Sequence, residues 1–182
     1  KPKVILDDWW RIAKGSYITA LEFENIEFSH TSNNKYFMNA DKSFTIESVS
    51  FVNCDFIGLT RGFWRHQQAT SKHIMSFAVE GCRFDKCGWQ TGSYGLMDLR
   101  SFNDPTAYDQ VDKAVFRNCT FSRDNDGTTG FGWGNLFNAP YIDKPIQLEF
   151  KNITVYNYCL NKRLINIGSA VGSELTIRSE ER

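Results

Sequence analysis

Two short stretches, LEFENIEF at residues 21–28 and VSFVNCDF at residues 49–56, determine the fold of this chain. The same pattern recurs in FAVEGCRF at 77–84, AVFRNCTF at 114–121 and LEFKNITV at 148–155, and a sixth copy begins at Leu175. The fifth position is Asn or Gly in every complete copy, and these positions are separated by 28, 28, 37 and 34 residues. Self-similarity at such intervals is typical of solenoid proteins, in which each repeat stacks on the next.

Each copy combines the periodicity of a strand with one break. Apolar and polar residues alternate, as expected of a strand with one buried face, and the Asn or Gly shifts the alternation by one residue. Asn and Gly tolerate the left-handed backbone of a tight corner, so we expect the chain to turn there and to start a second strand. We also expect this corner to be buried, with the stacked asparagine side chains hydrogen-bonding backbone groups of the neighbouring coil. A third short apolar strand follows each copy, at residues 36–38, 63–65, 96–99, 136–138 and 164–167.

Three short strands in every repeat predict an all-β fold, a parallel β-helix of about five to six coils. A β-sandwich, the alternative, would need hairpin turns, and the one hairpin candidate, Asp126-Gly127, does not recur. Cysteines 54, 82 and 119 share one register with Ile26 and Ile153, so we expect them to form a buried ladder of free thiols.

Composition indicates one domain and excludes several classes of protein. The 182 residues include 21 basic and 21 acidic side chains, a balance that argues against binding to nucleic acid or to an anionic membrane surface. No apolar run approaches the ~20 residues of a transmembrane helix. The sequence opens without a signal peptide. We expect a single β-helix domain over residues 1–182.

The repeats, together with Arg61-Gly62-Phe63-Trp64-Arg65 after the second copy, resemble pectate-lyase-like right-handed β-helix proteins. They are most similar to an uncharacterised domain of Bacteroidetes surface lipoproteins, which are usually encoded beside polysaccharide-uptake genes. The resemblance extends from Val4 to about Ile177. It implies a right-handed helix, which is also the usual hand of parallel crossovers. It further implies an extracellular or outer-surface location and a role with carbohydrate. On this resemblance we expect the chain to be a fragment of a larger secreted or surface protein, with neighbouring domains in the same chain.

The third strands carry the predicted binding site. Where their apolar residues point inward, the residues between them point outward and stack on successive coils. This outward stripe is expected to contain an aromatic ring, a carboxylate and amides, with cations at the strand ends and a further ring in a glycine-rich loop. Such a surface suits a sugar, although it is also what solvated outer positions of any solenoid would provide. The predicted ligand-binding residues are Trp64, Arg65, Asp98, Arg100, Asn138 and Trp133.

Three functions are compatible with these residues. The favoured one is non-catalytic binding of a poly- or oligosaccharide in glycan utilisation. The alternative is a polysaccharide lyase acting on glycans that contain uronic acid, which requires a cation and a base. Cations are available at Arg61, Arg65 and Arg100, but the sequence offers no convincing pair of a cation and a base. No catalytic residue is assigned. The third is a structural spacer.

We expect no cofactor and no metal. Asp124-Asn125-Asp126-Gly127 resembles half of a calcium-binding loop but lacks the bidentate Glu, so an Asx-rich turn is the favoured interpretation. The five cysteines lack the paired C-x-x-C spacing of a zinc site.

Overall fold

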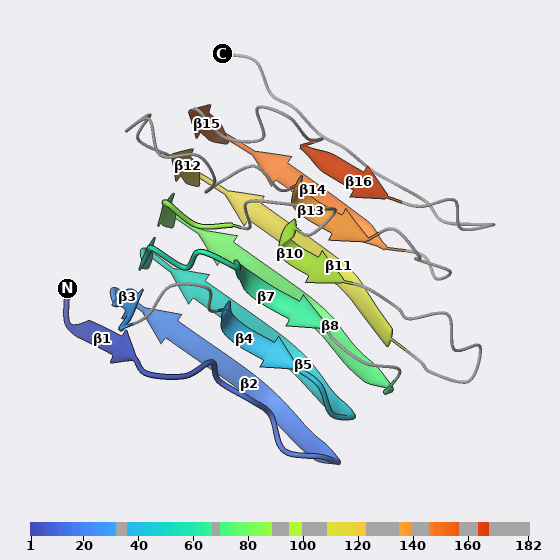
Figure 1. Ribbon diagram of the computed structural model, residues 1–182. Helices are drawn as coiled ribbons and strands as arrows, with labels where there is room; N and C mark the ends of the chain where they lie inside the picture. The colour runs from blue at the N-terminus through green and yellow to red at the C-terminus, as the bar shows by residue number, and fades with distance from the viewer. Residues whose placement is uncertain are drawn as a thin grey trace.

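The chain forms a parallel β-helix, as the repeats predict, and the helix is right-handed, as the resemblance implies. The computed structural model describes residues 1–31, 36–66, 70–88, 95–99, 109–122, 135–139, 146–156 and 164–167. Its regular elements in this part of the chain are all β-strands, and each strand pairs in parallel with its counterparts on neighbouring coils. Figure 1 shows the coils stacked from the N-terminal end (blue) towards the C-terminal end (red).

Three parallel sheets form the sides of the solenoid. The short-strand sheet contains β1 (Lys3–Leu6), β3 (Glu27–His30), β6 (Asp55–Ile57), β9 (Arg83–Asp85), β12 (Thr120–Ser122) and β15 (Thr154–Tyr156). The middle sheet contains β4 (Tyr36–Ala40), β7 (Gly62–His66), β10 (Gly95–Leu99), β13 (Asn135–Ala139) and β16 (Ile165–Ile167). The long-strand sheet contains β2 (Ser16–Glu24), β5 (Phe44–Val52), β8 (Lys72–Glu80), β11 (Asp109–Arg117) and β14 (Gln147–Lys151).

The corner between the long and the short strands has the predicted left-handed backbone. The φ angles are 56° at Asn25, 52° at Asn53, 63° at Gly81, 54° at Asn118 and 52° at Asn152. We expected this corner to be buried, and that expectation is wrong: all four asparagines are exposed. Their side chains are therefore not needed to satisfy buried backbone groups, and the left-handed conformation is the reason for their presence.

Side chains at this corner still contact one another along the stack. Asn152 Nδ2 donates a hydrogen bond to Asn118 Oδ1 at 3.0 Å. With the Asn53 side chain in its present position, a Cβ at Gly81 would collide with Asn53 Oδ1, so a side chain on this rung would require Asn53 to move.

Replacing Asn53 by alanine should lower the free energy of unfolding by about 1–2 kcal/mol, because a residue with a Cβ and no local hydrogen-bonding group pays that penalty in the left-handed region. Chemical denaturation measures the loss. Asn53→Gly is the matched control and should lose clearly less, since glycine adopts this conformation without strain. An equal loss in both variants would show that the amide, and not the backbone conformation, matters here.

The predicted cysteine ladder is confirmed. Cys54, Cys82 and Cys119 are buried free thiols that follow the corner on successive coils. Backbone hydrogen bonds link these rungs, with the Cys54 carbonyl accepting from Arg83 N at 3.0 Å and the Cys82 carbonyl from Thr120 N at 3.0 Å. Burial raises the pKa of Cys119 to about 11, so this thiol is protonated at neutral pH. The end rungs of the ladder, Ile26 and Ile153, are half-buried.

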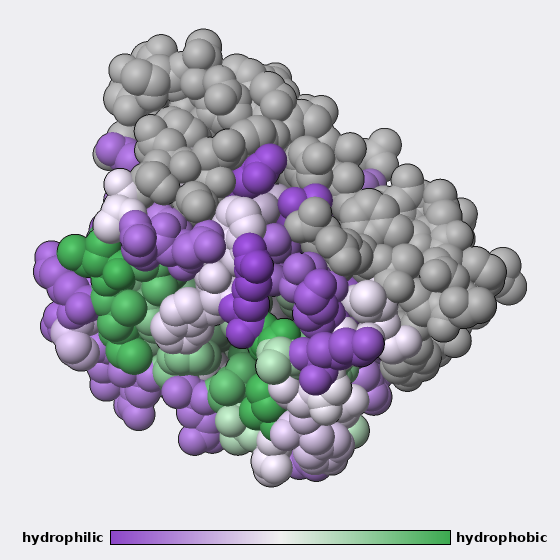
Figure 2. Space-filling view, turned by 60° about the horizontal axis from the view of Figure 1, so that its bottom comes forward, coloured by the Kyte–Doolittle hydropathy of each residue, from purple (hydrophilic) through white to green (hydrophobic). Residues whose placement is uncertain are grey.

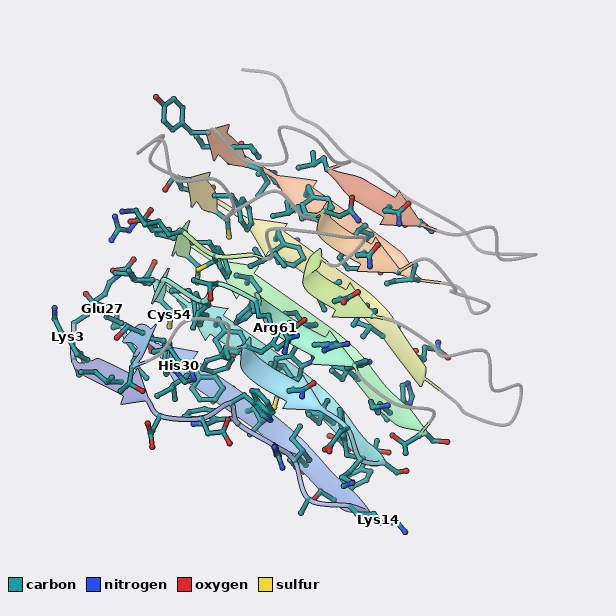
Figure 3. All side chains as sticks on the ribbon, in the orientation of Figure 1. Lys3, Lys14, Glu27, His30, Cys54 and Arg61 are labelled. Carbon is teal, nitrogen blue, oxygen red and sulfur yellow. The ribbon has the colours of Figure 1, made fainter. Side chains whose placement is uncertain are left out.

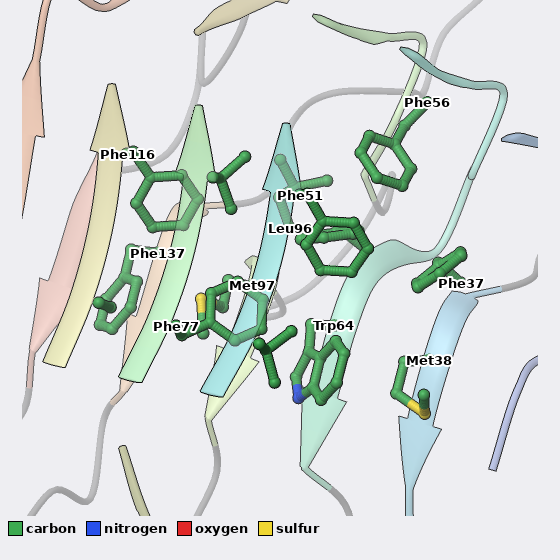
Figure 4. Close-up of a cluster of buried hydrophobic side chains, with 14 of the residues drawn as sticks. Phe37, Met38, Phe51, Phe56, Trp64, Phe77, Leu96, Met97, Phe116 and Phe137 are labelled. Atoms are coloured by element: carbon green, nitrogen blue, oxygen red, sulfur yellow. The ribbon is translucent and has the colours of Figure 1, made fainter. Parts of the chain in front are cut away.

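Stacked aromatic rings fill much of the interior. Phe28, Phe56, Phe84 and Phe121 form one column on the short-strand sheet, with ring centroids 5.3, 4.8 and 4.9 Å apart. Figure 4 shows rings from the three sheets meeting in the same core, and Trp64 is one of them. Identical positions of a parallel solenoid repeat at the ~4.8 Å strand spacing, so one ring type can stack on itself from coil to coil.

Candidate functional site

Trp64 does not point outward, and that part of the predicted binding site is wrong. Its side chain is fully buried, with its ring 5.0 Å from that of Phe77 on the long-strand sheet. It pairs in register with Met38 and Met97, which are also core residues. Phe63 and Trp64 both face the interior, so the outward position falls on Arg65, one residue later. A buried ring cannot stack on a sugar.

The outward stripe of the middle sheet is polar and buried. Its members align across the coils: Arg65 pairs in register with Asp98, Asp98 with Asn138, and Asn138 with Asn166. Asn166 Nδ2 donates to Asn138 Oδ1 at 2.8 Å, and Asn138 Nδ2 donates to Asp98 Oδ1 at 2.7 Å. Asp98 and Asn138 have no exposed surface, and Arg65 is only 8% exposed. These side chains connect neighbouring coils and do not present an open binding surface.

Two predicted site residues, Arg100 and Trp133, lie outside the described residues, as does the acidic loop at 124–127. Their part in binding stays a prediction. Of the predicted set, the structure brings together Arg65, Asp98 and Asn138. The Arg65 guanidinium lies over the ring of Tyr36, with 5.2 Å between the Arg65 Cζ and the ring centroid.

A different row of side chains, which the sequence analysis missed, occupies the outer face of the long-strand sheet. Tyr17 pairs in register with Thr45, Thr45 with His73, and His73 with Gln110. We call these four residues the binding row. They lie on β2, β5, β8 and β11, so each of four successive coils contributes one side chain. Tyr17 is 64% exposed, and the other three are half-buried.

Two carboxylates fix the orientation of the binding row. The Tyr17 hydroxyl donates a hydrogen bond to Glu47 Oε1, and this hydrogen bond raises the pKa of Tyr17 above its ordinary value. His73 Nε2 lies 2.9 Å from Asp112 Oδ2, and Gln110 donates to the other oxygen of the same carboxylate. The tyrosine ring, the imidazole and the amide are therefore each held by a hydrogen bond to a neighbouring side chain.

Three members of the binding row, Tyr17, Thr45 and His73, line a shallow hollow of about 320 Å³ at the beginning of the long strands, and Gln110 lies outside it. Figure 3 shows this end of the sheet, where Lys14 marks the entry into β2. Small polar residues from three coils form its floor beside the tyrosine ring and the imidazole. The lining residues are Gly15, Ser16, Tyr17, Ser43, Phe44, Thr45, Ser71 and His73.

A sequence signal for the binding row does exist. The successive intervals along the row, from Tyr17 to Thr45 to His73 to Gln110, are 28, 28 and 37 residues. The first four corner residues are separated by the same intervals. The row therefore lies at a constant distance before the corner of each repeat. These positions lie upstream of the eight-residue pattern around the corner, so that pattern alone does not include them.

A second hollow, of about 460 Å³, lies at the N-terminal end of the solenoid and is mainly apolar. It contains Trp10, which bridges to Met38 and packs on Phe23 and Phe37. Figure 2 brings this end forward and shows hydrophobic areas between hydrophilic ones. Because β2 is the outermost strand of its sheet, this hollow is the interior of the first coil as seen from its open edge.

Metal and membrane signals are absent from the part of the chain that the structure describes. No group of three or more His, Cys, Asp or Glu side chains there is arranged to hold a metal ion. The same residues include no helix of the length and apolarity that crossing a membrane requires.

Comparison of the chain with protein-family models, with curated proteins and with solved structures gives no match.

Proposed function

We propose that this protein is a glycan-binding β-helix domain, with the binding row of the long-strand sheet as its binding surface. The observation that carries the proposal is the exposed Tyr17 ring at the edge of an open hollow, beside oriented hydroxyl, imidazole and amide groups.

The chemistry of the binding row suits a sugar. The C–H face of a pyranose packs on an aromatic ring, and its hydroxyls need both donors and acceptors. Tyr17 provides the ring, while Thr45 and Gln110 each provide a donor and an acceptor. The carboxylates of Glu47 and Asp112 accept hydrogen bonds from hydroxyl groups. Because the strands of a solenoid are rigid, these groups are positioned before the ligand arrives, which lowers the entropy cost of binding.

Binding is better supported than lyase chemistry. A lyase needs a cation next to the base, to neutralise the uronate carboxylate while the proton leaves. His73 beside Asp112 is a candidate base. The neighbouring cation, Lys72, is fully buried and donates its Nζ to the Thr70 carbonyl at 2.9 Å, so it faces the interior. The groups that flank His73 on the outer face are Thr45 and Gln110, which carry no charge.

The proposal extends to location and partners. The resemblance of the repeats to pectate-lyase-like β-helix domains of surface lipoproteins supports an extracellular or outer-surface protein of glycan utilisation. Its partners would then be poly- or oligosaccharides and neighbouring domains of the same chain. Binding to immobilised glycans tests the function: the purified protein should bind at least one plant or microbial polysaccharide, and failure to bind any would favour the structural spacer.

Tyr17→Ala should weaken glycan binding by about five- to tenfold, because packing of the C–H face of one sugar on one aromatic ring is worth on the order of 1 kcal/mol. Isothermal titration with the bound glycan measures the change. Tyr156→Ala is the matched control: Tyr156 is 62% exposed but lies on β15 of the short-strand sheet. Its replacement should leave the affinity unchanged. Equal losses in both variants would indicate non-specific adhesion to exposed rings.

A further inference from the structure

We infer that the ligand is a linear oligosaccharide chain that lies parallel to the solenoid axis and spans four coils. The inference rests on the proposed function and adds the shape, length and direction of the glycan. It follows from the way in which the binding row is built.

The row contributes one side chain from each of four successive coils, in the order Tyr17, Thr45, His73, Gln110. Neighbouring parallel strands are ~4.8 Å apart, so the row extends over about 14 Å along the axis. A pyranose unit in a linear chain advances by about the same distance as one coil. Each sugar of a chain that follows the axis would therefore meet one side chain of the row.

A second row of side chains lies beside the binding row, two residues further along the same strands. Glu47, Met75 and Asp112 occupy the equivalent next outward position on β5, β8 and β11. Met75 is 38% exposed and lies on the coil between the two carboxylates. A chain along the axis would thus have polar contacts at Glu47 and Asp112 and an apolar contact at Met75. A ligand lying across the strands would meet only one or two members of each row.

The chemistry differs between the two ends of the row. The phenol ring belongs to the first coil, where the Tyr17 hydroxyl is held by Glu47. The fourth coil offers the Gln110 amide, which is held by Asp112. A short ligand obtains most of its binding free energy from the Tyr17 ring and does not extend to Gln110. A chain of four or more units can contact both Tyr17 and Gln110.

A chain-length series tests the inference. Wild-type protein is titrated with cello-, xylo- and malto-oligosaccharides and with oligogalacturonides of two to six units. The affinity for the series that binds should rise at each step up to four units and then stay level. Tyr17→Ala should weaken binding at every length, while Gln110→Ala should weaken only chains of four or more units, by about fivefold, the value of one hydrogen bond.

Gln147→Ala, an exposed glutamine on β14 that lies outside the binding row, is the matched control and should change nothing. Circular dichroism confirms that each variant is folded. Binding that does not depend on chain length, or Gln110→Ala losses that are equal for dimers and hexamers, would overturn the axial arrangement while leaving glycan binding intact. The absence of binding by every series would instead overturn the proposed function.

Discussion

Trp64→Ala should lower the free energy of unfolding by about 3–5 kcal/mol, the usual cost of removing a large aromatic side chain from a packed core. Trp64 is fully buried, and its ring makes edge contacts with Phe51 and Phe77 of the long-strand sheet. Without this side chain, a cavity would open where the middle sheet and the long-strand sheet face each other. Denaturant titration monitored by circular dichroism measures the loss.

The same variant separates a core role from a binding role. At a temperature at which Trp64→Ala is folded, its affinity for glycan should equal that of the wild type, because the binding row lies on another sheet. Trp64→Phe is the matched control and should lose less stability, since most of the volume is kept. A variant with unchanged stability and weakened binding would contradict the buried position and restore Trp64 as a sugar platform.

Cys82→Asp should be destabilising by about 3–5 kcal/mol, because an ionised carboxylate would then lie in the apolar core without a cation to pair with it. Cys82 is 2% exposed, and its thiol donates to the carbonyls of Phe51 and Glu80. A carboxylate cannot donate those hydrogen bonds and would face carbonyl oxygens instead. Thermal unfolding at pH 7 measures the loss, or the variant fails to fold.

The pH dependence identifies the cause of that loss. Burial raises the pKa of the introduced carboxyl in the folded state, so the folded protein takes up a proton before the unfolded chain does. The penalty should therefore be largest above this raised pKa and should shrink as the pH falls towards the ordinary value for Asp. Cys82→Ala, which introduces no charge, should lose less and show no such recovery. A penalty that is constant with pH would contradict the ladder's burial.

The fold was predictable because each coil of a solenoid repeats the same local sequence pattern. The corner residues, Asn25, Asn53 and Asn118 among them, need a left-handed backbone wherever they occur, and this requirement is local. The cysteine ladder follows from the corner, because Cys54, Cys82 and Cys119 come directly after it. The burial of the corner was predicted wrongly, because whether a corner is solvated depends on how the chain packs beyond it.

The binding site was harder to predict because the middle strands are joined to the corners by segments of unequal length. Because the interval between the corner and the middle strand varies, the sequence did not determine the register of Trp64 against Asp98. A shift of one residue changes which side chains face the core and which face outward. The structure aligns Asp98 with Arg65 instead. The binding row has a constant interval to the corner, so its alignment was available in the sequence. Its exposure and its hydrogen bonds to Glu47 and Asp112 depend on tertiary structure.

The binding of glycan by the long-strand sheet can be tested by locating bound glycan on the protein. Chemical shifts of backbone amides in a ¹⁵N-labelled sample, recorded during titration with the glycan that binds, report which coil faces contact it. We expect the largest changes at Tyr17, Thr45 and His73, and little change at Arg65 and Asp98 of the middle sheet. Changes centred on Arg65 and Asp98, with none along the binding row, would contradict it.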